Sequence, residues 1–363
     1  QFTAMAVLLL EEQDKQSVAD PVRKHIPEAP ETWAGVTIHH LLTHTSGIPS
    51  FTSLPDYKKT NALPAPPAET MKRVAGMPLE FAPGAQFKYS NTGYTLLGLI
   101  VERASGHDYA AFVKQKIFEP LGMNDSGYQD QKTILPRFAS GYSRGPKGLQ
   151  PAEHIDMTIP HAAGSLYSTT LDLLKWDAAL REAKLISAAS YRKYFTPEKG
   201  DYAYGWVVRK QGGLEIQMHG GGIEGFSTMI MRVPSEKLLV VTLANVQEAQ
   251  SGRLANDLLL LSLGKDAPKP AVRKEIPLPL ETLKRYEGVY RFAPTFAMTV
   301  TVEDGQLMTQ ATNQQKLPIY AETETRFFPK ALDATITFQV DGAGKVTGLV
   351  LDQNGRQMPA TRQ

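Results

Sequence analysis

The first residues of the chain have the hydrophobic pattern of a buried helix. Residues Phe2 to Glu12 are apolar apart from Thr3 and the two closing glutamates, and no Ser, Thr, Asp or Asn stands before them to cap a helix. The sequence also lacks an initiator methionine. We therefore predict a helix over 2–12 and expect that further residues preceded Gln1.

Shorter apolar runs are bounded by residues that end helices. Ile38 to His44 is predicted to form a short helix, closed by Ser46-Gly47 and stopped by Pro49. A longer helix is predicted from about 93 to 104 with Gly106 at its end, so that Tyr89 and Asn91 lie just before it. A third helix is predicted from a capping residue followed by helically spaced apolar residues: Ser168 or Thr169, then Leu171, Leu174, Trp176 and Leu180.

Near residue 202 the pattern changes to short β-rich runs separated by turn residues. The four runs are Tyr204 to Arg209, Leu214 to His219, Phe226 to Val233 and Leu238 to Ala244. The separators are Gly212-Gly213, the stretch Gly220 to Gly225, and Pro234-Ser235. This pattern predicts an antiparallel meander, with an apolar helix of about 247–263 lying against it. The fold class is therefore α+β, an α/β sandwich in which an antiparallel sheet is flanked by helices beside a mostly helical subdomain.

A proline-rich stretch divides the chain. Pro268, Pro270, Pro277 and Pro279 mark a linker over 268–280, which separates a domain of residues 1–267 from one of residues 281–363. In the second domain, residues 299–302 and 335–340 alternate in polarity, and Asp304-Gly305 and Asn354-Gly355 are typical of hairpin turns. These features predict a small antiparallel β domain that resembles a barrel.

Composition and charge narrow the classes of function. Of 363 residues, 42% are hydrophobic and 21% charged, which allows a full buried core. The 39 basic and 37 acidic side chains leave a net charge of +2, too weak for a protein that binds nucleic acid by neutralising phosphates. The chain has no cysteine, which excludes disulfides and thiolate chemistry. Its longest apolar run, Ala4 to Leu10, is far below the roughly 18 residues of a membrane span.

Three short motifs match the patterns of known functional sites, but the residues around them do not fit those sites. Gly141 to Gly145 fits the Gly-x-Ser-x-Gly elbow around Ser143, but Pro146 follows it, so we predict a loop there. The glycines from Gly220 to Gly225 fit a dinucleotide-binding pattern, yet a strand follows where that site needs a helix. His40 and His44 have the spacing of metal ligands without the catalytic Glu of a metalloprotease, so a structural or hydrogen-bonding pair is favoured and no metal is predicted.

Four motifs, taken in order, resemble those of serine β-lactamase-like hydrolases, in the branch of class C β-lactamases, esterases and D-aminopeptidases. They are Leu41-Leu42-Thr43-His44-Thr45-Ser46-Gly47-Ile48-Pro49, then Tyr89-Ser90-Asn91, then Gly164-Ser165-Leu166-Tyr167-Ser168-Thr169, then His219-Gly220-Gly221-Gly222-Ile223-Glu224-Gly225-Phe226. The resemblance covers about residues 1–265. The C-terminal domain resembles the lipocalin-like β domains of some members.

The resemblance implies an acyl-serine mechanism without a cofactor. Such enzymes use a Ser-x-x-Lys nucleophile, a Tyr-x-Asn element and a Lys/His-x-Gly strand. The resemblance implies that Tyr89 supplies the phenol and that Asn91 binds the substrate amide and orients the lysine. It also implies that His219 makes a hydrogen bond, either to this phenol or to a carboxylate of the substrate. The three glycines, Gly220, Gly221 and Gly222, would let the substrate approach, and the Gly222 amide would donate to the oxyanion. An ordinary imidazole at His219 would change activity between about pH 5.5 and 7.5.

The chain departs from this pattern at the nucleophile. In the family, the helix that resembles residues 1–12 follows the Ser-x-x-Lys element directly, so we expect this chain to begin one residue past the catalytic lysine and to be inactive as given. Two other Ser-x-x-Lys matches, at Ser190 and Ser262, come after the Tyr-Ser-Asn motif and are in the wrong order. Taken singly, Tyr89 and His219 would each be assigned a structural role, and only the ordered set favours catalysis.

Two functions remain open. The first is a hydrolase of an ester, a lactam or a D-residue peptide, with the loop from Ser50 to Pro67 and the β domain setting its preference. The second is a non-catalytic binding protein on the same scaffold, and the residues upstream of Gln1 would decide between them. The resemblance implies a periplasmic or secreted protein. Neither substrate identity nor oligomeric state can be deduced from the sequence.

Overall fold

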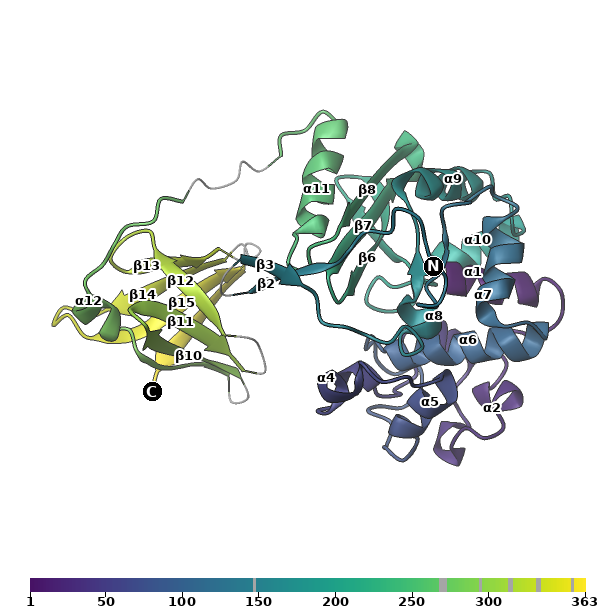
Figure 1. The fold of residues 1–363 in the computed structure, drawn as a ribbon, viewed down its shortest axis with the longest axis horizontal. Helices are drawn as coiled ribbons and strands as arrows, with labels where there is room; N and C mark the ends of the chain where they lie inside the picture. The colour runs from purple at the N-terminus through teal and green to yellow at the C-terminus, as the bar shows by residue number, and fades with distance from the viewer. Residues whose placement is uncertain (146–147, 268–272, 294–295, 313–315, 331–333, 354–355) are drawn as a thin grey trace. The chain divides into compact units, whose positions relative to one another are not determined.

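The computed structural model describes residues 1–145, 148–267, 273–293, 296–312, 316–330, 334–353 and 356–363. The chain forms two compact units, residues 1–267 and 268–363 (Figure 1), and each is considered by itself. The first combines helices with a four-stranded antiparallel sheet, and the second holds a closed barrel of eight antiparallel strands. The predicted fold class is confirmed.

The first unit contains most of the helices. In chain order, its α-helices are α1 (Phe2–Glu11), α2 (Val22–His25), α3 (Ile38–Leu42), α4 (Tyr57–Thr60), α5 (Pro67–Ala75), α6 (Asn91–Ser105), α7 (Tyr109–Val113), α8 (His161–Gly164), α9 (Thr170–Arg181), α10 (Ala188–Phe195) and α11 (Ser251–Ser262). Two pairs of short strands, β1 (Gly127–Tyr128) with β4 (Leu166–Tyr167) and β2 (Tyr142–Gly145) with β3 (Gly148–Pro151), lie between them.

Helix α6 is the central element of the helical part. It contacts α1, α3, α5 and α8, and ten of its consecutive residues, from Thr92 to Val101, are buried. A Cβ atom added at Gly98 would lie only 2.6 Å from the Ala162 side chain, so glycine lets α8 approach closely. The helix begins at Asn91, earlier than predicted, and ends as predicted at Gly106, which has the left-handed conformation that glycine favours.

The sheet follows the predicted meander. Its strands, β5 (Val207–Gln211), β6 (Leu214–Ile223), β7 (Phe226–Val233) and β8 (Leu238–Ala244), lie in the order of the chain. Because successive side chains of a strand point to opposite faces, Ile230 joins the helical core, whereas Met231 packs with Ala255 and Leu259 of α11. Helix α11 therefore covers one face of the sheet (Figure 1).

Three local predictions for the first unit are wrong. Gly220 to Gly222 belong to β6, where the ladder with β7 holds them in extended form, and they do not form a hairpin connection. Leu171 and Leu174 of α9 are exposed because the buried face is formed by Leu173, Trp176 and Leu180. The segment around Ser143, predicted to be a loop, is strand β2. Because β2 pairs with strand β3 and no helix follows it, the Gly-x-Ser-x-Gly nucleophile elbow remains excluded.

The second unit is a small closed barrel preceded by helix α12 (Leu280–Lys284). Its strands are β9 (Gly288–Ala293), β10 (Phe296–Glu303), β11 (Gln306–Ala311), β12 (Leu317–Ala321), β13 (Arg326–Pro329), β14 (Ala334–Val340), β15 (Val346–Gln353) and β16 (Arg356–Arg362). β16 pairs with β9, which closes the barrel. Tyr286, Tyr290, Phe327 and Phe338 fill its core.

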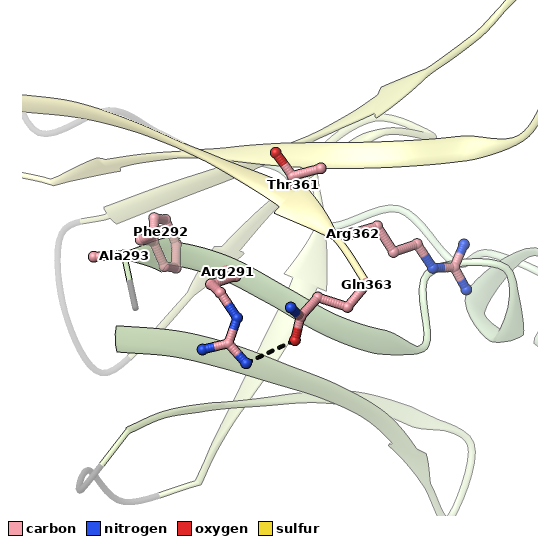
Figure 2. Close-up of a pocket in the computed structure, with 6 residues that line it drawn as sticks. All are labelled: Arg291, Phe292, Ala293, Thr361, Arg362 and Gln363. Atoms are coloured by element: carbon pink, nitrogen blue, oxygen red, sulfur yellow. Dashed lines mark hydrogen bonds between the residues drawn. The ribbon is translucent and has the colours of Figure 1, made fainter. Parts of the chain in front are cut away.

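The turn at Asp304-Gly305 is confirmed, since both residues have positive φ and join β10 to β11. Asn354-Gly355, Pro268 and Pro270 lie outside the described residues. An open hollow on the barrel is lined by Arg291, Phe292, Ala293, Thr361, Arg362 and Gln363, where Arg291 Nη2 donates to Gln363 Oε1 at 2.8 Å (Figure 2). No helix in the described part of the chain is long and apolar enough to cross a membrane.

A buried histidine makes the stability of the first unit depend on pH. His161 is 6% exposed, and burial lowers its pKa to about 4. Between about pH 6.5 and 4 the unfolded chain therefore binds a proton that the folded chain does not. The free energy of unfolding should fall by up to about 3 kcal/mol as the pH falls through this range, less any attraction from Glu102, whose Oε1 lies 3.8 Å away.

His161→Asn should reduce this loss by at least about 1 kcal/mol, because asparagine does not titrate and tolerates the φ of +41° at this position. Urea unfolding followed by tryptophan fluorescence at pH 7 and pH 4.5 measures the difference. The chain's three tryptophans, Trp33, Trp176 and Trp206, all lie in the first unit. An equal loss in both proteins would show that His161 is not a source of the pH dependence.

Candidate active site

Tyr89 lies immediately before helix α6, at the surface of a cluster of aromatic rings. Its side chain is 45% exposed, and its ring centroid is 4.1 Å from that of His44 and 6.4 Å from that of His219. Its phenol makes no hydrogen bond to any other described residue. Partial burial raises the pKa of Tyr89, so the phenol is neutral near pH 7 and would need a neighbouring cation to ionise.

His44 lies beneath Tyr89 and is almost fully buried. Its Nδ1 accepts the backbone N–H of Ser90 at 3.1 Å, so in the neutral ring the proton is on Nε2. Burial lowers the pKa of His44 well below its ordinary value, and the ring stays neutral. His44 and His40 both make hydrogen bonds, in line with the structural or hydrogen-bonding role favoured above. They do not bond to the same group, because His40 Nδ1 accepts the N–H of Thr37.

Both ring nitrogens of His219 are engaged. Nδ1 lies 2.7 Å from the carbonyl oxygen of Gly220, which can only accept, so Nδ1 carries the proton. Nε2 therefore accepts the hydroxyl of Tyr202 at 2.8 Å. Burial lowers the pKa of His219 to about 4, which places its titration below the range of pH 5.5 to 7.5 expected from an ordinary imidazole. The expected hydrogen bond to the Tyr89 phenol is replaced by the one from Tyr202.

The glycines after His219 form an open strand edge. β5 pairs with β6 only as far as Met218, whereas β7 pairs with β6 up to Ile223. Gly220 to Gly222 are exposed, and their backbone is uncovered on the side away from β7. A Cβ atom at Gly221 would lie 2.4 Å from the hydroxyl of Thr228, so a side chain fits there only if Thr228 changes its rotamer. A substrate could add to this edge as a short extra strand.

The side chain of Asn91 is held by the loop that follows Pro49. Its Nδ2 donates to Thr52 Oγ1 at 3.1 Å, and its backbone N–H donates to Ser50 Oγ at 3.1 Å. The two hydroxyls lie 2.8 Å apart and hydrogen-bond to each other. These contacts use the amide nitrogen of Asn91 and leave its Oδ1 to accept a hydrogen bond from a substrate or a lysine.

The same loop is tied to the turn between β6 and β7. Glu224, whose side chain is only 8% exposed, accepts hydrogen bonds from Lys58 Nζ at 2.9 Å and Asn61 Nδ2 at 3.0 Å. The loop thus joins Asn91 at one end to the turn beside Gly222 at the other. These contacts place a segment remote in sequence beside the open edge.

Gln1, directly before α1, reaches this cluster. The Gln1 carbonyl accepts the hydroxyl of Tyr194 at 2.7 Å. A Cβ atom at Gly205 would lie 2.7 Å from the Gln1 backbone nitrogen and 3.5 Å from Tyr94 Oη, and Tyr94 stacks on His44 at a ring distance of 5.0 Å. The beginning of α1 is therefore close to the aromatic cluster.

The structure brings together the residues that the sequence singled out, and adds others. Tyr89, Asn91, His219 and the glycine edge lie around one site, whereas Ser190 is buried in α10 beside a lysine that pairs with Glu11. Tyr202 was missed, since nothing distinguishes it among fourteen tyrosines. The described residues hold no group of three or more His, Asp or Glu side chains that could bind a metal ion.

Comparison with known proteins finds matches over both units of the chain. The family model of beta-lactamases matches residues 1–264, and a domain of unknown function (DUF3471) matches residues 272–362. Penicillin-binding protein 4* of Bacillus subtilis is 31% identical over an alignment of 387 positions, which covers 99% of this chain and 85% of that protein.

Solved structures of similar proteins have a similar fold. The octameric penicillin-binding protein homologue from Pyrococcus abyssi has a TM-score of 0.65 at 29% identity, over 99% of this chain and 86% of that one. A D-amino acid amidase from Ochrobactrum anthropi has a TM-score of 0.58 at 25% identity, over 68% of this chain and 74% of that one.

Proposed function

This chain belongs to the beta-lactamase family, and we propose that it provides the site of a serine hydrolase that acts through an acyl-serine intermediate on an ester, a lactam or a D-residue peptide. The observation that carries this proposal is the meeting of Tyr89, His219 and the open edge of β6 near Gln1, which directly precedes α1. The family relatives include penicillin-binding proteins and a D-amino acid amidase, which supports acyl-transfer chemistry.

In the proposed reaction the serine is supplied by a Ser-x-x-Lys element joined to Gln1. Residues 1–88 contain no such element. Its lysine would directly precede α1, beside the aromatic cluster, where an ammonium group would oppose the effect of burial and lower the pKa of Tyr89. The serine Oγ bonds to the substrate carbonyl carbon while its proton passes to the lysine and Tyr89 pair.

The remaining steps use groups of this chain. The Gly222 N–H would donate to the oxyanion, and Asn91 Oδ1 would accept from the substrate amide. The bond to the leaving group then breaks as that group takes up the proton. Water attacks the acyl-serine in the second half of the reaction, and the same pair accepts its proton and returns it to the serine.

Labelling with a fluorophosphonate tests this proposal. Residues 1–363 alone should remain unlabelled, because no Ser-x-x-Lys element precedes the Tyr-Ser-Asn motif in them. An extended chain, in which a segment ending in Ser-x-x-Lys precedes Gln1, should label with one probe per molecule at the added serine. Replacing that serine by alanine provides the control.

Two results would contradict the proposal. Labelling of Ser143, Ser190 or Ser262 in the unextended chain would place the nucleophile elsewhere. A folded extended chain that stays unlabelled would favour the non-catalytic binding protein.

A further inference from the structure

A substrate that pairs with β6 must do so beyond Met218. β5 covers that strand only up to Met218, which leaves Gly220 to Gly222 with one uncovered edge. His219 and Tyr89 lie beside this edge, and Glu224 is at its far end. The part of the substrate next to the reacting bond therefore meets the groups around these glycines.

Among the described residues, these groups give a carboxylate no cation to bind. His219 donates its one N–H to Gly220 and accepts the hydroxyl of Tyr202 through its other nitrogen. The three glycines contribute no hydroxyl. Because His219 is neutral near pH 7, a carboxylate placed beside it would lose hydration without gaining an ion pair.

Three of the cations that flank the site in the sequence have carboxylate partners. These ion pairs are Lys88 with Glu80, Lys58 with Glu224, and Arg209 with Asp201. A cation whose charge is already balanced attracts a second carboxylate less strongly than a free one does. The charge balance around the site thus favours an uncharged substrate.

We infer, on the basis of the proposed function, that this site accepts esters or amides with an uncharged leaving group and discriminates against leaving groups that carry a carboxylate. Among the three substrate classes, this favours neutral esters and peptide amides over lactams or peptides that end in a free acid. His219 and Gly220 act here as residues that determine specificity.

Two esters of similar shape, which differ in the charge of one substituent, test this inference. They are 3-carbamoylphenyl phenylacetate and 3-carboxyphenyl phenylacetate, whose hydrolysis by the extended chain is followed through release of the phenol. We expect kcat/KM to be at least about tenfold higher for the carbamoyl ester. This is the size of effect expected when a charged group of the substrate finds no partner of opposite charge in the site. The preference should persist in Lys199→Met, which removes a nearby lysine that has no ion-pair partner among the described residues.

A double variant should reverse the preference. His219→Lys with Gly220→Ser adds a cation and a hydroxyl at the edge, and a side chain fits at Gly220 if the flexible end of Met229, 3.3 Å from the new Cβ, moves slightly. The carboxyl-to-carbamoyl ratio of kcat/KM should rise at least about tenfold, whereas His219→Gln, which adds no charge, should leave that ratio unchanged.

The possible outcomes separate the two proposals. If the extended chain hydrolyses neither ester, the proposed function itself fails. If it hydrolyses both esters and prefers the carboxyl ester, or if Lys199→Met loses the preference for the carbamoyl ester, the enzyme is a serine hydrolase and the inference about charge is wrong. A double variant with an unchanged ratio would also contradict it.

Discussion

Replacing Asp177 by alanine is expected to lower the free energy of unfolding of the first unit by about 3–5 kcal/mol. Asp177 Oδ1 accepts Arg232 Nε at 2.8 Å, and both side chains are almost fully buried between α9 and β7. Arg232 Nη1 also donates to Gln217 Oε1 at 2.8 Å. Without Asp177, a buried guanidinium would be left with no counter-charge, and burial of an unpaired charge is strongly unfavourable.

The double variant Asp177→Ala with Arg232→Met should recover much of this loss, because neither charge then remains buried. Urea unfolding followed by tryptophan fluorescence measures the first unit alone. As a control, Lys72→Ala breaks an exposed ion pair with Glu69 and should change the free energy of unfolding by less than about 1 kcal/mol. A double variant as unstable as Asp177→Ala would show that lost packing, and not the unpaired charge, causes the effect.

The parts of the fold that could be predicted are those with a local signal. β7 and β8 were located to the residue, because each β-rich run is bounded by turn residues at both ends. The glycines of β6 could not be assigned to a strand in this way, since glycine weakens a strand. Pairing with β7 keeps them extended, and such pairing is a property of the folded sheet.

Helix α9 shows why burial is harder to predict than helix formation. Leu171 and Leu174 have the same helical spacing as the residues that are in fact buried, so the sequence carries two possible apolar faces. Contact with the rest of the core selects the face that contains Trp176, and no local pattern records that contact. The same limit applies to functional residues.

The candidate site shows this limit for functional residues. Tyr89, Asn91 and His219 were singled out in the sequence because they stand in motifs of fixed order. Tyr202 was not found, because its hydrogen bond to His219 spans seventeen residues and no motif surrounds it. The tautomer of His219 follows from its contact with the Gly220 carbonyl, and its lowered pKa follows from burial. Both are properties of the folded chain, so the titration range could not be predicted from the sequence.

The clearest catalytic effect is expected at Tyr89. In the extended chain, Tyr89→Phe should lower kcat by at least about a hundredfold, the lower range for a positioned acid or base. The phenylalanine ring can keep the contact with His44, and the lost hydroxyl has no hydrogen-bond partner among the described residues. The free energy of unfolding should therefore hardly change, which separates a catalytic defect from a folding defect.

A matched variant tests whether the effect belongs to this phenol. Tyr191→Phe removes a hydroxyl from α10, where the ring of Tyr191 packs against Phe195, and it should leave kcat unchanged. Steady-state kinetics on the carbamoyl ester compare the two variants with the parent. If Tyr89→Phe turned over at the parent rate, Tyr89 would be only a packed aromatic residue, and the proton of the serine would have to pass to the lysine alone.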